Sequence, residues 1–198
     1  EKVIYFQHKE RAAEVLPYAL LRGEDDLSLA DVVTEAIEFL DNDKGFFIMA
    51  EGGQIDWAAH ANDITNTIHE TIDFDEAIQV AYEFYLKHPD ETLIVVTADH
   101  ETGGVTLGRT KGYTFDLSLV PEKALSAKTD SEKNVENYMQ QYPADSLSKA
   151  AKIGWTTSSH TGGAIPVFAM GAGSSRFAGR ADNTDIPKRI ISAMGIEW

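Results

Sequence analysis

Apolar residues recur along this chain with two different spacings, one typical of amphipathic helices and the other of buried strands. Over residues 29–40 they fall three and four positions apart, and Ser28 stands where a helix N-cap is expected. The same spacing predicts a longer helix over residues 64–86, with Pro89 just beyond its end, and a last helix over residues 184–194.

Continuous apolar runs lie between these helices. They occupy residues 46–50, 93–97 and 165–170, and a strand-like run also opens the chain at residues 3–6. Uninterrupted apolar runs of this length are typical of strands that are covered on both faces. Because strands and helices alternate, we expect an α/β fold in which a mostly parallel central sheet is flanked by helices.

Residues 109–152 break this alternation. The segment is more polar, contains Pro121 and Pro143, and carries one predicted helix over residues 131–141. We interpret it as an insertion within one domain that spans residues 1–198, a length that allows a substantial core.

Charge and composition narrow the function classes. The chain has 17 Lys and Arg residues against 32 Asp and Glu residues, a formal net charge of −15, which argues against nucleic acid as a specific partner. It has no cysteine, so any bound zinc must be held by His, Asp or Glu. No apolar run approaches the roughly 18 residues of a membrane span, so we expect none.

The first polar cluster follows the predicted strand at residues 46–50. Glu51 stands at the strand end and is followed by two glycines, Asp56 and His60. Asp56 and His60 are four residues apart, so one helical turn places both side chains on the same face, where they can chelate one metal ion.

Two further clusters are candidates. Asp99 and His100 come just after the predicted strand at residues 93–97, and the third is His160, which precedes two glycines. At a strand end the chain can turn, and we expect Asp99 and His100 to converge on one ion. Such ligands suit zinc where histidine is present and magnesium where carboxylates dominate.

Each cluster taken alone has an ordinary alternative. An Asp and a His one helical turn apart usually form a surface pair, an Asp-His dipeptide after a strand is more often a loop or a cap, and His160 alone carries almost no signal. His8, His69 and His88 lack this strand-end context and are assigned to solvent or helix surfaces. The coincidence of three such clusters favours a metal site.

Three segments of the chain resemble the metal-binding segments of alkaline phosphatases in sequence, order and spacing. They are residues 45–60 (GFFIMAEGGQIDWAAH), residues 97–104 (TADHETGG) and residues 160–162 (HTG). The resemblance spans nearly the whole chain and is weakest between Arg109 and Ile153. It implies the C-terminal part of a three-layer α/β/α catalytic domain, with residues 109–152 as a small crown-like insertion.

The resemblance also implies a ligand set and a reaction. Asp56, His60 and His160 correspond to ligands of a first zinc ion, Asp99 and His100 to ligands of a second, and Glu51 to a magnesium ligand. The implied cofactors are thus two Zn²⁺ and one Mg²⁺. The implied reaction is hydrolysis of small-molecule phosphate monoesters through a phosphoserine intermediate.

The chain departs from the family pattern at one ligand segment and lacks a nucleophile. Trp57 stands where other branches have His or Lys, so the third metal site is expected to differ in preference. No segment resembles the nucleophile motif, and no catalytic residue is assigned in this chain. Because the chain begins at Glu1, not Met, we expect truncation upstream and an inactive isolated fragment.

Other readings stay open beside the phosphomonoesterase. One is a related hydrolase acting on phosphodiesters or sulfates, although Glu51 favours the phosphomonoesterase branch because diesterases generally lack its equivalent. Another is a non-catalytic zinc-binding domain. The resemblance further implies a periplasmic or extracellular location, and homodimers are common in the family.

Overall fold

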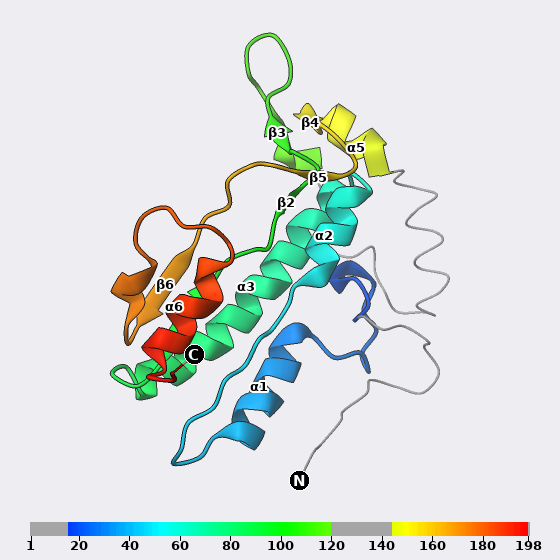
Figure 1. Ribbon diagram of the computed structural model, residues 1–198. Coiled ribbons are helices and arrows are strands. Elements are labelled where there is room, and N and C mark those ends of the chain that lie inside the picture. The colour runs from blue at the N-terminus through cyan, green and yellow to red at the C-terminus, as the bar shows by residue number, and fades with distance from the viewer. Residues whose placement is uncertain (1–15, 120–143, 198) are drawn as a thin grey trace.

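The computed structural model describes residues 16–119 and 144–197 (Figure 1). Its α-helices are α1 (Leu29–Leu40), α2 (Gly53–His60), α3 (Ile64–Lys87), α5 (Ala144–Ala150) and α6 (Asp185–Ala193). Its strands are β1 (Leu93–Val96), β2 (Glu101–Thr102), β3 (Thr106–Leu107), β4 (Ile153–Gly154), β5 (His160–Thr161) and β6 (Phe168–Gly171). Short 3₁₀ helices occur at η1 (Ala19–Leu21), η2 (Leu117–Leu119) and η3 (Ser174–Phe177).

Helix α3 is the element on which the described fold is assembled. It has 24 residues and runs diagonally through the molecule, with α1, α2, α5, η1 and β1 packed against it (Figure 1). Asp63 caps its first turn by accepting a hydrogen bond from the Asn66 backbone N–H. The predicted helix over residues 64–86 is confirmed, as is the predicted last helix, since α6 is flanked by Thr184 and Met194 as its caps.

Helix α1 follows the prediction residue for residue. Ser28 is its N-cap and accepts a hydrogen bond from the Asp31 backbone N–H, while the Asp31 carboxylate accepts one from the Ser28 backbone N–H. This capping box satisfies two amide groups that a helix start otherwise leaves unpaired. Val33 is the buried residue of the helix.

The predicted parallel central sheet is not confirmed. Within the described residues the strands form three two-stranded ladders, β1 with β6, β2 with β5 and β3 with β4, and all three are antiparallel. Two predicted strands exist, since β1 lies within residues 93–97 and β6 overlaps residues 165–170 and ends one residue later, but they pair with each other over Leu93↔Gly171 to Val96↔Phe168. The alternation of strands and helices along the sequence did not indicate that β1 would pair with β6.

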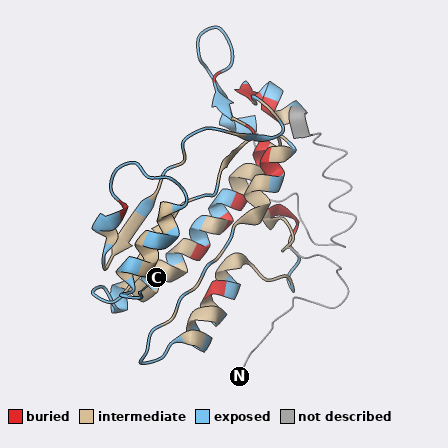
Figure 2. Cartoon of the chain, in the orientation of Figure 1, coloured by how far each residue is buried: buried red, intermediate tan, exposed pale blue. Residues whose placement is uncertain are grey.

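Residues 46–50 were expected to form a buried strand, and the structure assigns them no strand. The Phe46 ring packs edge-on against Phe84 of α3, with centroids 5.5 Å apart. Phe47 and Met49 are exposed, with 56% and 82% of their surface accessible. The chain between α1 and α2 has exposed and intermediate residues and no buried one (Figure 2). The segment is therefore covered on one face only, whereas its continuous apolar sequence is typical of a strand covered on both faces.

The largest buried cluster lies where the metal-site segments meet. Ile64, Ala151 and Ile153 form its centre, and Ile68, Leu147 and Trp155 pack around them. The Trp155 indole N–H donates to Ser148 Oγ at 2.9 Å, and Ser148 Oγ in turn donates to the Asn62 carbonyl oxygen at 3.2 Å. These contacts tie the chain after β4 to the junction between α2 and α3.

The two ends of the segment 109–152 lie side by side. The Arg109 backbone N–H donates to the Lys152 carbonyl oxygen at 3.1 Å, and the Asp116 N–H donates to the Ala151 oxygen at 3.0 Å. The chain thus leaves and returns at one place, next to the β3–β4 pair. The predicted helix at residues 131–141 and the predicted strand at residues 3–6 lie outside the described residues.

An ionic cluster joins η1 to the middle of α3. The Arg22 guanidinium makes a two-pronged ion pair with the Asp73 carboxylate, and both side chains are largely buried. Beside it, the Ala19 backbone N–H donates to Glu70 Oε1 at 2.5 Å. Burial of the Glu70 carboxyl raises its pKa. Burial of the Tyr18 hydroxyl, together with the nearby charges of Asp63 and Glu70, raises the pKa of that hydroxyl to about 12.

Among the described residues, no helix is both long enough and apolar enough to cross a membrane.

Candidate metal centre

Helix α2 carries the two candidate ligands that the sequence spacing predicted, Asp56 and His60. Ala58 and Ala59 are buried where α2 packs on α3, and Gly52 lies so close to Phe74 that an added Cβ would stand 3.1 Å from its ring. Small residues at this contact let the two helices approach closely. Asp56 and His60, one turn apart, remain partly exposed, with His60 Nε2 3.4 Å from Asp56 Oδ2.

His160 reaches α2 from a distant part of the sequence through the β2–β5 ladder. In this ladder Thr102 pairs with His160 and Glu101 pairs with Thr161. The loop before β5 is held by hydrogen bonds from the Gly103 N–H to the Ser159 oxygen and from the Thr156 N–H to the Gly103 oxygen. Gly103 has a φ of +86°, and a Cβ there would lie 2.6 Å from Trp155, so only glycine fits.

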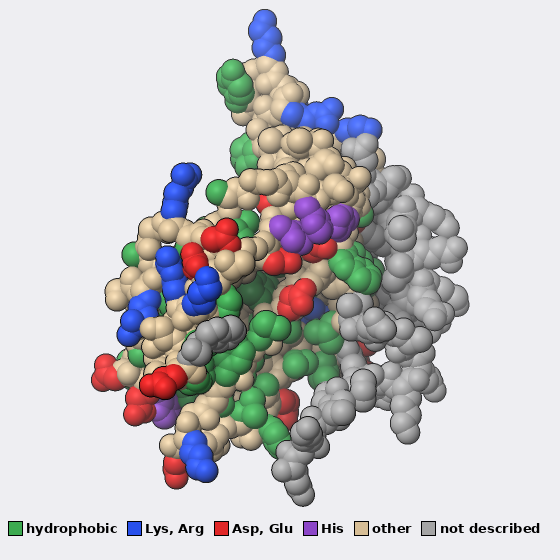
Figure 3. Space-filling model, viewed as in Figure 1, with side chains coloured by type: hydrophobic (Ala, Val, Ile, Leu, Met, Phe, Trp, Pro, Cys, Tyr) green, Lys and Arg blue, Asp and Glu red, His purple; other side chains and the backbone are tan. Residues whose placement is uncertain are grey.

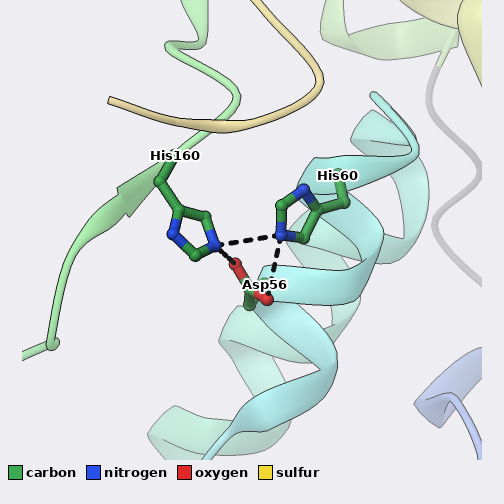
Figure 4. A group of neighbouring side chains, drawn as sticks. All are labelled: Asp56, His60 and His160. Atoms are coloured by element: carbon green, nitrogen blue, oxygen red, sulfur yellow. Dashed lines mark hydrogen bonds and ion pairs between the residues drawn. The ribbon is translucent and has the colours of Figure 1, made fainter. Parts of the chain in front are cut away.

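Asp56, His60 and His160 converge on one point (Figure 4). His60 Nε2 lies 3.1 Å from His160 Nε2 and 3.4 Å from Asp56 Oδ2, and His160 Nε2 lies 3.8 Å from Asp56 Oδ1. Tetrahedral zinc with bonds of 2.0–2.1 Å separates its ligand atoms by about 3.3 Å. The three side chains therefore have the spacing and the donor atoms of a zinc site.

A hydrogen bond at Nδ1 of His60 determines which ring nitrogen is directed at the site. His60 Nδ1 lies 2.7 Å from the Ser158 carbonyl oxygen, which can only accept, so Nδ1 carries the hydrogen. In a neutral imidazole the lone pair then remains on Nε2, the atom that faces Asp56 and His160.

The second predicted pair lies beside this group. His100 Nε2 is 3.1 Å from Asp99 Oδ2, so the two neighbouring side chains do turn toward one point, although 84% of the Asp99 side chain is exposed. The His100 and His160 rings are stacked with centroids 3.5 Å apart. His60, His100 and His160 thus lie together, and Figure 3 shows a patch of histidine side chains on the surface with acidic side chains next to it.

Glu51 is not drawn into the group. It is exposed just ahead of α2, with its carboxylate close to Gly53. Among the residues that the structure describes, three ligand-type side chains meet only at Asp56, His60 and His160.

Sequence reasoning missed the residues that support the ligands. The Thr102 hydroxyl donates to Asp56 Oδ1 at 2.5 Å and lies 3.2 Å from His100 Nδ1. The Glu101 carboxylate accepts a hydrogen bond from the Gly104 N–H at 2.8 Å and one from the Thr161 hydroxyl. Glu101 directly follows His100 and Thr102 comes one residue later, and this closeness in sequence was the one signal that could have drawn attention to them.

Comparison with known proteins agrees with this geometry. Residues 12–196 match the family described as alkaline phosphatase. Alkaline phosphatases 3 and 4 of Bacillus subtilis (strain 168) are each 36% identical to the chain, over 90% and 86% of its length. The chain therefore belongs to the alkaline phosphatase family.

Solved structures give the same result. The cold-active alkaline phosphatase from the psychrophile Shewanella sp. superposes with a TM-score of 0.73 at 30% identity, covering 90% of this chain and 52% of that one. The alkaline phosphatase from Thermus thermophilus has a TM-score of 0.71 at 22% identity, which supports the fold alone. The chain spans 46% and 44% of the two Bacillus subtilis relatives, less than half their length.

Proposed function

We propose that the protein containing this chain hydrolyses phosphate monoesters with two zinc ions and one magnesium ion, through a phosphoserine intermediate. The observation that carries the proposal is the convergence of Asp56, His60 and His160 at zinc-ligand spacing in a member of the alkaline phosphatase family. The family resemblance grouped His160 with Asp56 and His60, and the structure independently brings the three side chains together.

The ligand assignment divides the six residues among three ions. Asp56, His60 and His160 would hold the first zinc, Asp99 and His100 the second, and Glu51 the magnesium. The turn of Asp99 toward His100 supports the second site. A variant of the alkaline phosphatase from the Antarctic bacterium TAB5 was solved with Mg bound in the M3 site, which supports magnesium in the third.

The chain's own groups would prepare the site before any ion binds. When bound, the two zinc ions would polarise the phosphoryl oxygens and stabilise the charge on the leaving oxygen. The Ser158 carbonyl holds the His60 lone pair toward the site, and Thr102 holds Asp56. Ligands fixed in this way lose little freedom on binding, which favours affinity and geometry.

This chain would supply ligands and not the nucleophile. Ser158 and Ser159, the serines nearest the site in sequence, serve through backbone carbonyl oxygens that accept from His60 and Gly103. We therefore propose that the attacking serine belongs to another part of the protein and that this chain alone is inactive. For the whole protein we also propose a three-layer α/β/α fold with a parallel sheet, a crown-like role for residues 109–152, a homodimer and a periplasmic or extracellular location.

The alternative within the same chemistry is a hydrolase of phosphodiesters or sulfate esters, which can use the same zinc ligands. A non-catalytic zinc-binding domain is the alternative outside it. Chromogenic monoester, diester and sulfate substrates tested side by side separate the first two, and zinc binding without turnover on any of them would indicate the third.

The experiment that tests the proposal compares two histidine variants of the intact protein. His160→Ala removes a proposed ligand, and His88→Ala removes an exposed histidine that stacks on Phe84 at the far end of α3. We expect the His160 variant to lose at least about 100-fold in kcat/KM for a chromogenic phosphate monoester, because a supporting group alone typically costs 10–100-fold. The His88 variant should match the wild type.

Two results would contradict the proposal. One is wild-type protein that hydrolyses the monoester equally well after zinc is removed by a chelator. The other is equal activity of the His160 and His88 variants, which would mean that the three converging side chains take no part in the reaction.

A further inference from the structure

Thr102 stands between the two proposed zinc sites. It lies in β2, where it pairs with His160, and its side chain is partly buried. Its hydroxyl oxygen is 2.5 Å from Asp56 Oδ1, a proposed ligand of the first zinc, and 3.2 Å from Nδ1 of His100, a proposed ligand of the second. One hydroxyl group therefore contacts a ligand of each site.

The hydrogens of this contact can be assigned by counting. A threonine hydroxyl has one hydrogen to donate and two lone pairs to accept with, and an ionised carboxylate can only accept. At 2.5 Å from Asp56 Oδ1, the Thr102 hydrogen must point to the carboxylate, because two bare oxygens would repel at that distance.

This assignment leaves Thr102 Oγ1 as an acceptor toward His100. Nδ1 of His100 must then carry the ring hydrogen and donate it, since an unprotonated nitrogen facing a lone pair would make no bond. The other ring nitrogen, Nε2, lies 3.1 Å from Asp99 Oδ2. The contact with Thr102 therefore holds the His100 ring with Nε2 toward its proposed partner.

We propose that Thr102 is a positioning residue that couples the two metal sites: its hydroxyl orients Asp56 for the first and holds the His100 ring with Nε2 toward the second. This inference rests on the proposed function. Because one hydroxyl serves both ligands, its loss should weaken both sites together. A purely structural threonine would affect stability and leave both affinities unchanged.

The first test measures zinc affinity of the intact protein by competition with a chelator. Thr102→Val removes the hydroxyl at nearly constant volume, Thr102→Ser keeps it, and Thr34→Val removes a hydroxyl that donates to the Ala30 carbonyl oxygen of α1, far from the site. We expect about 10–100-fold weaker binding at both sites for Thr102→Val, the usual cost of losing a supporting group. Thr102→Ser and Thr34→Val should bind as the wild type does.

The second test reads the hydrogen on Nδ1 of His100 directly, from nitrogen chemical shifts of the metal-free protein at alkaline pH. The wild type should carry a hydrogen on Nδ1, donated to Thr102 Oγ1. Thr102→Val offers Nδ1 no acceptor, so less of the hydrogen should be found there. A wild-type His100 with no hydrogen on Nδ1 would overturn the inference, whatever the stability of the variants.

The outcomes separate this inference from the proposed function. Wild-type protein that binds no zinc overturns both. Wild-type protein that binds two zinc ions and hydrolyses the monoester, with Thr102→Val matching Thr34→Val in both affinities, overturns the role of Thr102 and leaves the phosphatase standing.

Discussion

At the scale of single residues, candidate ligands are held in place by hydrogen bonds to other parts of the chain. His60 is held by the Ser158 carbonyl, and Asp56 is held by the Thr102 hydroxyl. In each case the supporting atom comes from a segment distant in sequence. The candidate ligands could be named from local motifs, such as Asp56 and His60 one helical turn apart, and from the family resemblance, whereas their supporting contacts depend on the folded β2–β5 ladder.

Glu70 gives a prediction at this scale. Its carboxyl is buried and its pKa is raised, chiefly by the loss of solvent, so the folded protein keeps this proton to higher pH than the unfolded chain does. As pH rises above the unfolded value of about 4.3, the ionised group should therefore lower the free energy of unfolding. Glu70→Gln removes the charge and keeps an oxygen that can accept from the Ala19 N–H.

We expect Glu70→Gln to be more stable than the wild type at neutral pH and equal to it below pH ~4, where both side chains are uncharged. Urea unfolding of both proteins across this pH range measures the difference. A variant that is less stable at neutral pH, or a difference that does not change with pH, would show that the Glu70 charge is satisfied by its surroundings, for example by Arg22.

Elements were predicted better than the contacts between them. Helices α1, α3 and α6 could be recognised because apolar spacing and caps such as Ser28 are local features. Strand pairing is not local: β1 pairs with β6, some 70 residues later, and no feature of either strand named the other. The two-stranded ladder that carries His160 is too short to predict from an apolar pattern.

The Arg22–Asp73 pair gives a prediction at the scale of elements, because it fastens η1 to α3. Arg22→Met would leave the Asp73 carboxylate buried without its partner, at a cost of about 3–5 kcal/mol in the free energy of unfolding. Replacing both residues with apolar ones should recover most of that loss. Chemical denaturation of the single and double variants measures it.

A matched control is Lys188→Met, which breaks the exposed ion pair of Lys188 with Asp185 at 2.9 Å in α6. Exposed pairs contribute about 0–1 kcal/mol, so this variant should stay close to the wild type. Similar losses in the free energy of unfolding for Arg22→Met and Lys188→Met would mean that the Arg22–Asp73 pair contributes no more than an ordinary surface pair.

At the scale of the whole molecule, the predicted parallel central sheet is not confirmed by the described residues. Residues 46–50 have the sequence of a strand covered on both faces, yet Phe47 and Met49 are exposed, and so is Phe168 on β6. The strands of a sheet can come from any part of a chain, and this chain spans less than half of the Bacillus subtilis relatives. The apolar run therefore predicted a burial that Phe47 and Met49 do not have in the structure.

The candidate site was predictable at this scale only as a coincidence of three clusters. Helical spacing placed Asp56 beside His60, but nothing in the spacing joined them to His160, 100 residues further along. The fold makes that connection by pairing β5 with β2 next to α2. Glu51 carries no such connection within the described residues, so its magnesium role rests on resemblance.

The most direct test of the account is a crystal structure of the intact protein grown with zinc, with data collected on both sides of the zinc absorption edge. We predict an anomalous peak bonded to an Asp56 carboxylate oxygen, His60 Nε2 and His160 Nε2 at about 2.0–2.1 Å. A protein that is active on phosphate monoesters but shows zinc elsewhere, with these three side chains left unbonded, would contradict the account.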